Sequence, residues 1–238
     1  MNGFVLITGA AKRLGRVIAL HLAASGWDIV VHYHTSRAEA DELAQLIRAL
    51  GRTVHVVQTD LMDNKAVEGL IPSLAAAKCR ITGLINNASL FVSDIHDPEG
   101  LHHCAINYDA PVKLSALMAQ NLPPDSTGCI VNLLDGTPIP NTFSAYRDSK
   151  EKLRDATIAM ALDLAPYVRV NAIAPGPTMK NPRQSDDHFA RMVAATPLGL
   201  ETPPEAVAGA VRFLLENPVI TGAILPIDGG AHLIAPTS

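Results

Sequence analysis

Short apolar runs alternate along the chain with longer stretches in which apolar residues recur every three or four positions. The short runs predict strands of a β-sheet, at Phe4–Thr8, Asp28–Tyr33, Thr53–Val57, Ile81–Asn86, Cys129–Leu134, Val168–Ile173 and Ala223–Ile227. The longer stretches predict helices, at Leu14–Ala24, Ser36–Leu50, Asn64–Ala77, Glu99–Leu122 and Ser144–Leu164, with a final helix after Thr202. Capping boxes are predicted where Ser36 precedes Glu39 and Thr202 precedes Glu205, and Pro203 suits the first position of the last helix.

This order of elements predicts an α/β fold. Strands that alternate with helices form parallel sheets, because a helical crossover returns the chain to the same edge. Right-handed crossovers then give a single Rossmann-type domain over residues 1–238, a doubly wound parallel sheet of about seven strands with helices on both faces. Ligands of such sheets bind outside the carboxyl ends of the strands, and the polar motifs of this chain fall there.

Composition and charge narrow the function classes. The chain has 238 residues, 48% of them hydrophobic, and a net charge of −4, which favours neither a nucleic acid nor a membrane surface as partner. It has no apolar run long enough to span a bilayer, and its apolar start lacks the basic segment of a signal peptide. The isolated cysteines Cys79, Cys104 and Cys129 indicate buried reduced thiols, a cytoplasmic location and no metal site.

A glycine-bearing turn follows the first predicted strand and opens a helix. Glycine lets backbone approach a pyrophosphate closely, and the helix N-terminus supplies free N–H groups. We therefore expect the turn to bind a dinucleotide, through Gly9, Lys12, Arg13, Leu14 and Gly15. Two glycines also suit a purely structural turn, and Arg13 also suits a solvated position in a first helical turn.

The end of the second strand lacks the Asp or Glu that holds the ribose 2′-hydroxyl in NAD enzymes. It offers cations and hydrogen-bond donors to a 2′-phosphate instead, from His32, Tyr33, His34, Ser36 and Arg37, which predicts NADP(H) as the cofactor. The alternative is that Ser36 only caps its helix and Arg37 only faces water. Beyond the next two strands, further residues are expected to outline the same groove, namely Asp60, Leu61, Asn87, Ala88 and Ser89.

Tyr146 and Lys150 lie four positions apart in a predicted helix and therefore share one face. The pair suits hydride-transfer chemistry, because a lysine ammonium, together with the nicotinamide cation of the oxidised complex, would stabilise the tyrosine anion and lower the tyrosine pKa from about 10 towards neutrality. The lysine can also bond the nicotinamide ribose. Asn107, close before Pro111, is expected to bend its helix or to hold a water molecule near the lysine.

In their order along the chain, these motifs resemble the short-chain dehydrogenase/reductase family over nearly the whole sequence. The matching residues are Thr8–Gly9, Asn86–Ala88, Asn107, Tyr146 with Lys150, and Pro175–Gly176. Three features are similar to the pteridine reductase branch of that family, namely Arg13 within Thr8–Gly15, the segment His32–Ser36, and Asp135 near the place of the usual catalytic serine.

The resemblance implies roles for particular residues. In pteridine reductases the positions of Phe91 and Arg13 contact the pterin, Arg13 also contacts phosphate, and the position of Asp135 assists protonation of a ring nitrogen. The resemblance also implies a homotetramer, a cofactor site that includes Lys150, Pro175 and Gly176, and a substrate site that includes Ser89 and Tyr146. Asp135 stands two residues closer to Tyr146 than in the family, and Thr35 stands where a basic residue is expected.

Three functions remain open from the sequence. The first is an NADPH-dependent reductase of a pteridine C=N bond, with Tyr146, Lys150, Asp135 and Asn107 as catalytic residues, because a carboxylic acid can protonate a ring nitrogen. The second is a carbonyl reductase, such as a 3-oxoacyl thioester reductase, in which Asp135 is only a turn residue. The third is a non-catalytic dinucleotide-binding regulator. Residues 176–197 are expected to cover a small-molecule substrate.

Overall fold

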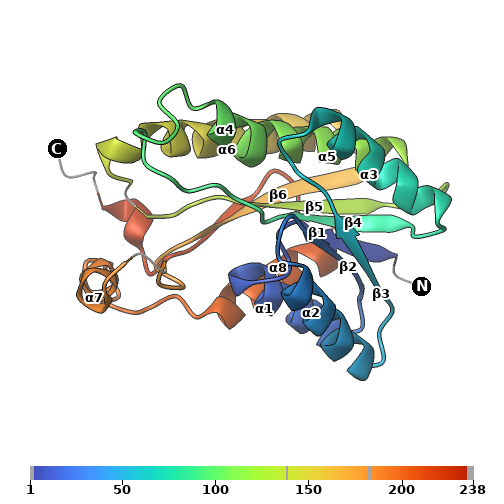
Figure 1. Cartoon of the computed structure of the whole chain (residues 1–238), viewed down its shortest axis with the longest axis horizontal. Helices are drawn as coiled ribbons and strands as arrows, with labels where there is room; N and C mark the ends of the chain where they lie inside the picture. The colour runs from blue at the N-terminus through green and yellow to red at the C-terminus, as the bar shows by residue number, and fades with distance from the viewer. Residues whose placement is uncertain (1–2, 138, 182–183, 235–238) are drawn as a thin grey trace.

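The computed structural model describes residues 3–137, 139–181 and 184–234, and within them it forms a seven-stranded sheet (Figure 1). The strands are β1 (Phe4–Ile7), β2 (Asp28–Tyr33), β3 (Val54–Gln58), β4 (Ile81–Asn86), β5 (Gly128–Leu133), β6 (Val168–Pro175) and β7 (Ile224–Ile227). Neighbouring strands are parallel throughout, in the order β3-β2-β1-β4-β5-β6-β7. The predicted doubly wound α/β fold is therefore confirmed.

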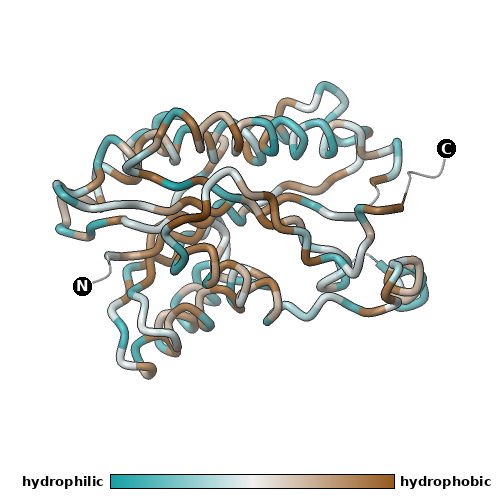
Figure 2. The backbone as a smooth tube through the Cα atoms, turned by 180° about the vertical axis from the view of Figure 1, so that it is seen from behind, coloured by the Kyte–Doolittle hydropathy of each residue, from teal (hydrophilic) through white to brown (hydrophobic). Residues whose placement is uncertain are grey.

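Helices cover both faces of the sheet. They are α1 (Arg13–Ala24), α2 (Arg37–Ala49), α3 (Asn64–Ala76), α4 (Leu101–Cys104), α5 (Ala110–Gln120), α6 (Ser144–Asp163), α7 (Asp186–Ala194) and α8 (Pro204–Glu216), with a π-helical turn η1 (Ala105–Asp109) and 3₁₀ turns η2 (Asn141–Phe143) and η3 (Ala231–Leu233). Figure 1 shows α1, α2 and α8 below the sheet and α3 to α6 above it. In both Figures 1 and 2, α7 stands apart at one end of the sheet, beyond the two layers.

The two helical layers enclose two apolar cores. Within β1, Val5 and Ile7 belong to the core under α1, α2 and α8, whereas Leu6 belongs to the core under α3, α5 and α6. Because both faces of a parallel sheet are covered, its strands are continuously apolar, and the hydrophobic stretches of Figure 2 run through the middle of the molecule. This is why the strand positions could be predicted from short apolar runs.

The predicted helix Glu99–Leu122 is interrupted. It forms as α4 and α5, which the π-helical turn η1 joins around Asn107. Pro111 cannot donate a backbone hydrogen bond to the carbonyl of Asn107, four residues earlier, so the regular helical ladder is weakened at this point. The predicted distortion at Asn107 is confirmed, and the single long helix is wrong.

Neither predicted capping box forms. Ser36 is the N-cap residue of α2 but its side chain makes no capping bond, and Glu39 forms an ion pair of 2.7 Å with Lys12 instead. The last helix begins one residue later than predicted, with Pro203 as N-cap and Pro204 first in the helix. Thr202 lies outside that helix, where its N–H donates to the carbonyl of Pro177.

All three cysteines are free, but only Cys79 and Cys129 are buried. Cys104 is partly exposed on α4, and the ammonium of Lys152 lies 3.4 Å from its sulfur. The expectation of three buried thiols is therefore wrong for Cys104, because α4 turns this side of the helix outward. Of the helices in the described ranges, none has both the length and the apolar run needed to cross a bilayer.

Candidate active site at the carboxyl edge of the sheet

The turn between β1 and α1 is built for close backbone approach. Gly9 has a φ of 62°, and a Cβ atom on Gly15 would lie 2.4 Å from the Gly9 carbonyl oxygen. The side chain of Asn87, which follows β4, donates to the carbonyl of Thr8 at 2.8 Å. The Thr8 hydroxyl accepts the N–H groups of Asn87 and Ala88, both at 2.9 Å. The ends of β1 and β4 are thus fixed to each other, and the amino end of α1 opens beside them.

His32 lies beneath this turn. Its Nδ1 accepts the Gly9 N–H at 3.1 Å, so its Nε2 carries the hydrogen that is donated to the Thr59 carbonyl at 3.0 Å. Burial lowers the pKa of His32 to about 4, so the ring is neutral near pH 7. Both ring nitrogens are already bonded, which makes His32 a positioning residue and leaves it no free nitrogen for the 2′-phosphate contact expected from the sequence.

Cations gather where β2 runs into α2. Lys12 pairs with Glu39 at 2.7 Å, and Arg37 donates to Asp41 at 2.7 Å and to the Tyr33 hydroxyl at 3.2 Å. The pKa of Arg37 is raised, first by its hydrogen bond to Asp41. These side chains are solvent-accessible, and an arginine fork beside a lysine is a set of donors that suits a phosphate.

The ends of β2 and β3 meet at the same edge. The His34 ring lies 3.8 Å from the Asp60 carboxylate, and that carboxylate also accepts the N–H of Met62. Leu61 is buried against the core, and Leu14 packs against the core from the first turn of α1. The structure therefore brings the residues predicted along this groove to one edge, with Ser36 at the start of α2.

Asn107 is fully buried in η1 and holds the segment after β4. Its Oδ1 accepts the N–H of Leu90 at 2.8 Å and the hydroxyl of Ser89 at 3.2 Å. Its Nδ2 donates to the Leu90 carbonyl and to the Ser149 hydroxyl, both at 3.0 Å. The side chain thus links the segment after β4 to α6.

Tyr146 and Lys150 are buried on one face of α6, as predicted. The Tyr146 hydroxyl donates to Oδ2 of Asp135 at 2.9 Å, so Asp135 reaches the tyrosine in spite of its short spacing. Lys150 donates to the Leu133 carbonyl at 2.9 Å, and its ammonium lies 5.8 Å from the centre of the Tyr146 ring.

Thr137 fixes the orientation of Asp135. Oδ1 of Asp135 accepts both the backbone N–H of Thr137, at 2.8 Å, and its hydroxyl, at 2.5 Å. The other carboxylate oxygen is left for Tyr146. Sequence reasoning missed Thr137, although a threonine two residues after an aspartate is typical of such a local turn.

The pKa values of the central pair follow from burial. Burial and then the Asp135 carboxylate raise the pKa of Tyr146 well above its usual value, and the Ser89 hydroxyl opposes them. Burial lowers the pKa of Lys150 to about 8, against the effect of Asp135. Lys150 therefore does not lower the tyrosine pKa in the chain without cofactor, because burial and the Asp135 carboxylate outweigh it, and the lowering expected for the cofactor complex stays a prediction.

Phe91 presents an aromatic surface beside this pair. Its ring stacks on that of Phe143, with centroids 4.5 Å apart and planes 2° from parallel, and meets the Tyr146 ring almost perpendicularly at 4.7 Å. Phe91 is 43% exposed. Phe143 was not predicted, although its position three residues before Tyr146 is a signal that could have found it.

Arg13, in the turn between β1 and α1, contacts the segment 176–197 that is predicted to cover the substrate. Its guanidinium donates to the carbonyls of Met179 and Lys180, at 2.9 and 3.0 Å. The segment starts where β6 ends, with the Pro175 carbonyl accepting the N–H of Gly136 and the Gly176 N–H donating to Ile227, and it contains α7.

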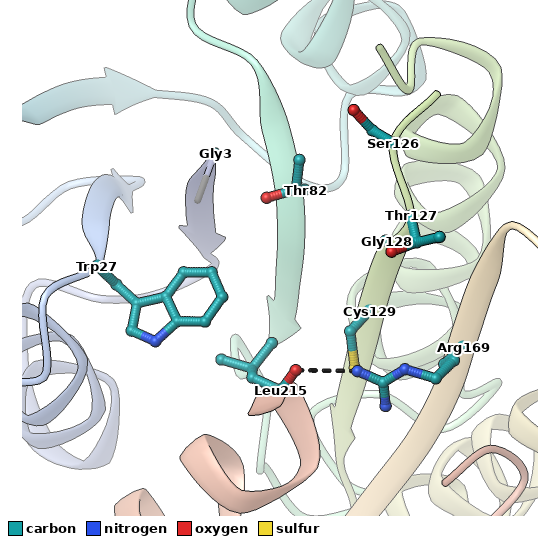
Figure 3. Close-up of a pocket in the computed structure, with 9 residues that line it drawn as sticks. All are labelled: Gly3, Trp27, Thr82, Ser126, Thr127, Gly128, Cys129, Arg169 and Leu215. Carbon is teal, nitrogen blue, oxygen red and sulfur yellow. Dashed lines mark hydrogen bonds between the residues drawn. The ribbon is translucent and has the colours of Figure 1, made fainter. Parts of the chain in front are cut away.

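A hollow of about 290 Å³ lies at the opposite end of the sheet, lined among others by Trp27, Thr82, Cys129 and Arg169 (Figure 3). In Figure 3 the guanidinium of Arg169 points at the carbonyl of Leu215, and it also donates to carbonyls that end α8. Burial raises the pKa of the Cys129 thiol to about 11. In this hollow the Arg169 cation is bound to backbone, the Cys129 thiol is buried and no predicted site residue is among the described residues that line it, so we assign the candidate active site to the carboxyl edge.

Comparisons with known proteins agree with the fold. A family model described as enoyl-(acyl carrier protein) reductase matches residues 9–232. FolM alternative dihydrofolate reductase 1 of Brucella canis, whose crystal structure contains NADP, is 37% identical, with a TM-score of 0.93 over 99% of this chain and 96% of that one. An uncharacterized oxidoreductase of Mycobacterium tuberculosis is 32% identical over 94% of this chain and 90% of its own. A 3-oxoacyl-(acyl-carrier-protein) reductase of Aggregatibacter actinomycetemcomitans is 28% identical over 97% and 99%.

Proposed function

The chain belongs to the short-chain dehydrogenase/reductase family, and we propose that within it the protein is an NADPH-dependent reductase of a pteridine C=N bond. It is an oxidoreductase, as its relatives are, so a non-catalytic regulator is set aside. The observation that carries the substrate class is the hydrogen bond from Tyr146 to Asp135, beside the exposed ring of Phe91.

The residues present fit NADP(H). The turn at Gly9 and Gly15 leaves no room for side chains and presents the amino end of α1, which suits a pyrophosphate. Lys12, Ser36 and Arg37 would hold the 2′-phosphate, and the FolM structure of Brucella canis contains NADP. When bound, the cofactor supplies a hydride. Further contacts with it are proposed for Asp60, Leu61, Asn87, Ala88, Ser89, Lys150, Pro175 and Gly176.

Asp135 and Tyr146 give the site a shared proton. Reduction of C=N adds a hydride to carbon and a proton to nitrogen, so the site needs a group that can deliver that proton. The hydrogen between the Tyr146 oxygen and Oδ2 of Asp135 is positioned for this task, and the raised pKa of Tyr146 keeps the phenol protonated. A carboxyl group beside the phenol is a sensible partner for a ring nitrogen.

The substrate ring is proposed to lie against Phe91. A planar heterocycle can stack on an aromatic face, and the exposed Phe91 ring already makes parallel and perpendicular ring contacts. Arg13 and Ser89 would add polar contacts, and residues 176–197, of which 182–183 lie outside the described residues, would cover the substrate. The expected cytoplasmic location and homotetramer stay predictions.

A 3-oxoacyl thioester reductase is the second candidate. The 3-oxoacyl-(acyl-carrier-protein) reductase of Aggregatibacter actinomycetemcomitans, 28% identical to this chain, supports it. Against it stands the segment Asn132–Asp135, which has no serine hydroxyl to polarise a carbonyl and has Asp135 in contact with the tyrosine instead.

The test is NADPH oxidation with dihydrobiopterin, dihydromonapterin and dihydrofolate, each compared with an acetoacetyl thioester. We expect turnover of at least one pterin and little or none of the thioester. Turnover confined to the thioester would overturn the pteridine proposal and make the protein a carbonyl reductase.

A further inference from the structure

We propose that Asp94 is a positioning residue, which fastens the substrate-facing segment to the amino end of α6, the helix that carries Tyr146. Asp94 lies in the irregular segment between β4 and α4, three residues after Phe91. The inference rests on the proposed function only in that the substrate must lie against Phe91.

Asp94 caps α6 from outside that helix. Its Oδ2 accepts the N–H and the hydroxyl of Ser144, at 3.0 and 2.8 Å, and its Oδ1 accepts the N–H of Ala145 at 3.2 Å. Its own N–H donates to the carbonyl of Thr142 at 3.0 Å. The residue at the N-cap position of α6 is Phe143, which has no capping side chain, so the helix depends on Asp94 for this role.

The same few residues of α6 also receive Phe91. Phe91 stacks on Phe143 and meets Tyr146, while Asp94 bonds the residues between those two rings. On the other side of Phe91, the backbone of Leu90 is held by Asn107. The backbone is therefore restrained on both sides of Phe91, by the side chain of Asn107 before it and by the carboxylate of Asp94 after it.

Burial alone does not fix Phe91. Its ring is 43% exposed, and the segment around it has no regular backbone hydrogen bonding. A partly exposed aromatic ring on an irregular segment keeps one orientation only when neighbouring bonds restrict the backbone. The Asp94 bonds provide that restriction at the amino end of α6, where the proposed substrate face and the proton-delivering tyrosine meet.

A general stabilising cap must be distinguished from a positioning residue, and α3 offers the matched control. Asp63 caps α3 through the same kind of bonds, because its carboxylate accepts the N–H groups of Lys65 and Ala66 at 2.9 and 3.2 Å. Asp63→Ala and Asp94→Ala each remove one aspartate cap. Only Asp94→Ala frees the segment that carries Phe91.

The experiment measures steady-state kinetics and thermal unfolding of the full chain, the two alanine variants and Asp94→Asn. We expect Asp94→Ala to raise the KM for dihydrofolate about fivefold, the effect of losing one cap, with the KM for NADPH changed less than about twofold. Asp94→Asn keeps one acceptor oxygen and is expected to recover part of the loss. Asp63→Ala should lower the Tm as Asp94→Ala does, with the KM for dihydrofolate unchanged.

A double variant tests whether Asp94 acts through Phe91. In a Phe91→Leu background, Asp94→Ala should add little to the KM for dihydrofolate, because the ring that Asp94 positions is gone. An unchanged KM in Asp94→Ala and Asp94→Asn, an equal rise in Asp63→Ala, or full additivity with Phe91→Leu would each overturn the proposal. If the wild-type chain reduces only the acetoacetyl thioester, the proposed function has failed, and the same variants measured with the thioester still decide the role of Asp94.

Discussion

The hydroxyl of Tyr146 donates a hydrogen bond of 2.9 Å to Asp135, a residue eleven positions earlier in the chain. Asp135 follows β5 and Tyr146 lies in the first turn of α6, so the connection between strand and helix brings a carboxylate to the phenol at the carboxyl edge of the sheet. The contact leaves Oδ1 of Asp135 to Thr137, so each carboxylate oxygen has its own partners.

Removal of this carboxylate should abolish pterin reduction without loss of the cofactor. In Asp135→Ala we expect kcat with the preferred pterin to fall by about 100-fold or more, the usual size of a lost partner in general acid–base catalysis. Binding of NADPH, followed by its fluorescence, should stay unchanged. Wild-type turnover in this variant would show that Asp135 is only a loop residue.

Thr137 should matter through Asp135. Thr137→Val removes the hydroxyl that donates to Oδ1 of Asp135 at 2.5 Å, so the carboxylate loses part of its orientation. We expect kcat with a pterin to fall about tenfold, which corresponds to one hydrogen bond to a charged group. Thr137→Ser keeps the hydroxyl and should stay near wild type. Equal loss in both variants would assign the effect to packing of the threonine methyl group.

Arg37 should decide between NADPH and NADH. The Arg37 guanidinium lies on the Tyr33 hydroxyl and on Asp41, beside the proposed 2′-phosphate position. We expect Arg37→Ala to raise the KM for NADPH about tenfold and to leave the KM for NADH unchanged, since only NADPH carries the charge. Arg212, which makes an equivalent ion pair with Glu216 on α8, gives the control variant Arg212→Ala. Equal changes for both cofactors would contradict this role.

His32 should make folding stability depend on pH. Its pKa is about 4 in the folded protein, below the 6.5 that is ordinary for a histidine, so the folded state binds fewer protons between these values. The contribution of His32 to the free energy of unfolding is therefore fully present above pH 6.5. It is lost as the pH drops towards 4, by about 3 kcal/mol in total. Urea unfolding at pH 7 and at pH 4.5 measures the change, and His32→Asn should fall less steeply. An equal slope in both proteins would rule out His32 as the cause.

Arg13 should hold the covering segment to the body of the enzyme. Its backbone φ of 52° is one that glycine adopts without strain, so Arg13→Gly removes the two bonds to Met179 and Lys180 without new backbone strain. We expect trypsin to cut after Lys180 several-fold faster in this variant, at an unchanged Tm. Lys78, which lies in a turn after α3, provides a second cleavage site as internal control. Equal rates of cleavage after Lys180 in wild type and variant would contradict the proposal that Arg13 holds this segment.

The sequence predicted the sheet because buried parallel strands are apolar without interruption, as Phe4–Ile7 shows. It did not predict α7, because no residue of Asp186–Ala194 is buried and the helix depends on the Ser185 cap and on acidic residues in its first turn. Local patterns therefore predicted elements that pack against the core and missed one that stands apart from it.

Within the site, residue identities were predictable and partners were not. Asn107, Tyr146 and Lys150 stand where the motifs put them, but burial and the hydrogen bond to Asp135 raise the pKa of Tyr146 instead of lowering it. His32 was expected to contact a 2′-phosphate and is instead a buried neutral ring whose nitrogens bond Gly9 and Thr59. These pKa values and hydrogen-bond partners depend on contacts between segments that are distant in the chain. The spacing of residues along one segment gives no information about such contacts.

A π-helical turn holds one residue more than an α-helical turn, so Asn107 stands where the helix from α4 to α5 has gained a residue. Deleting one residue of Ala105–Asp109 would remove the extra residue of the π-helical turn, but it would rotate α4 against α5 by about 100° and carry the amide away from Leu90. The irregular helix thus places the Asn107 side chain where it can bond Leu90. An engineer who removes this irregularity should therefore expect an impaired catalyst, because Asn107 would no longer hold Leu90.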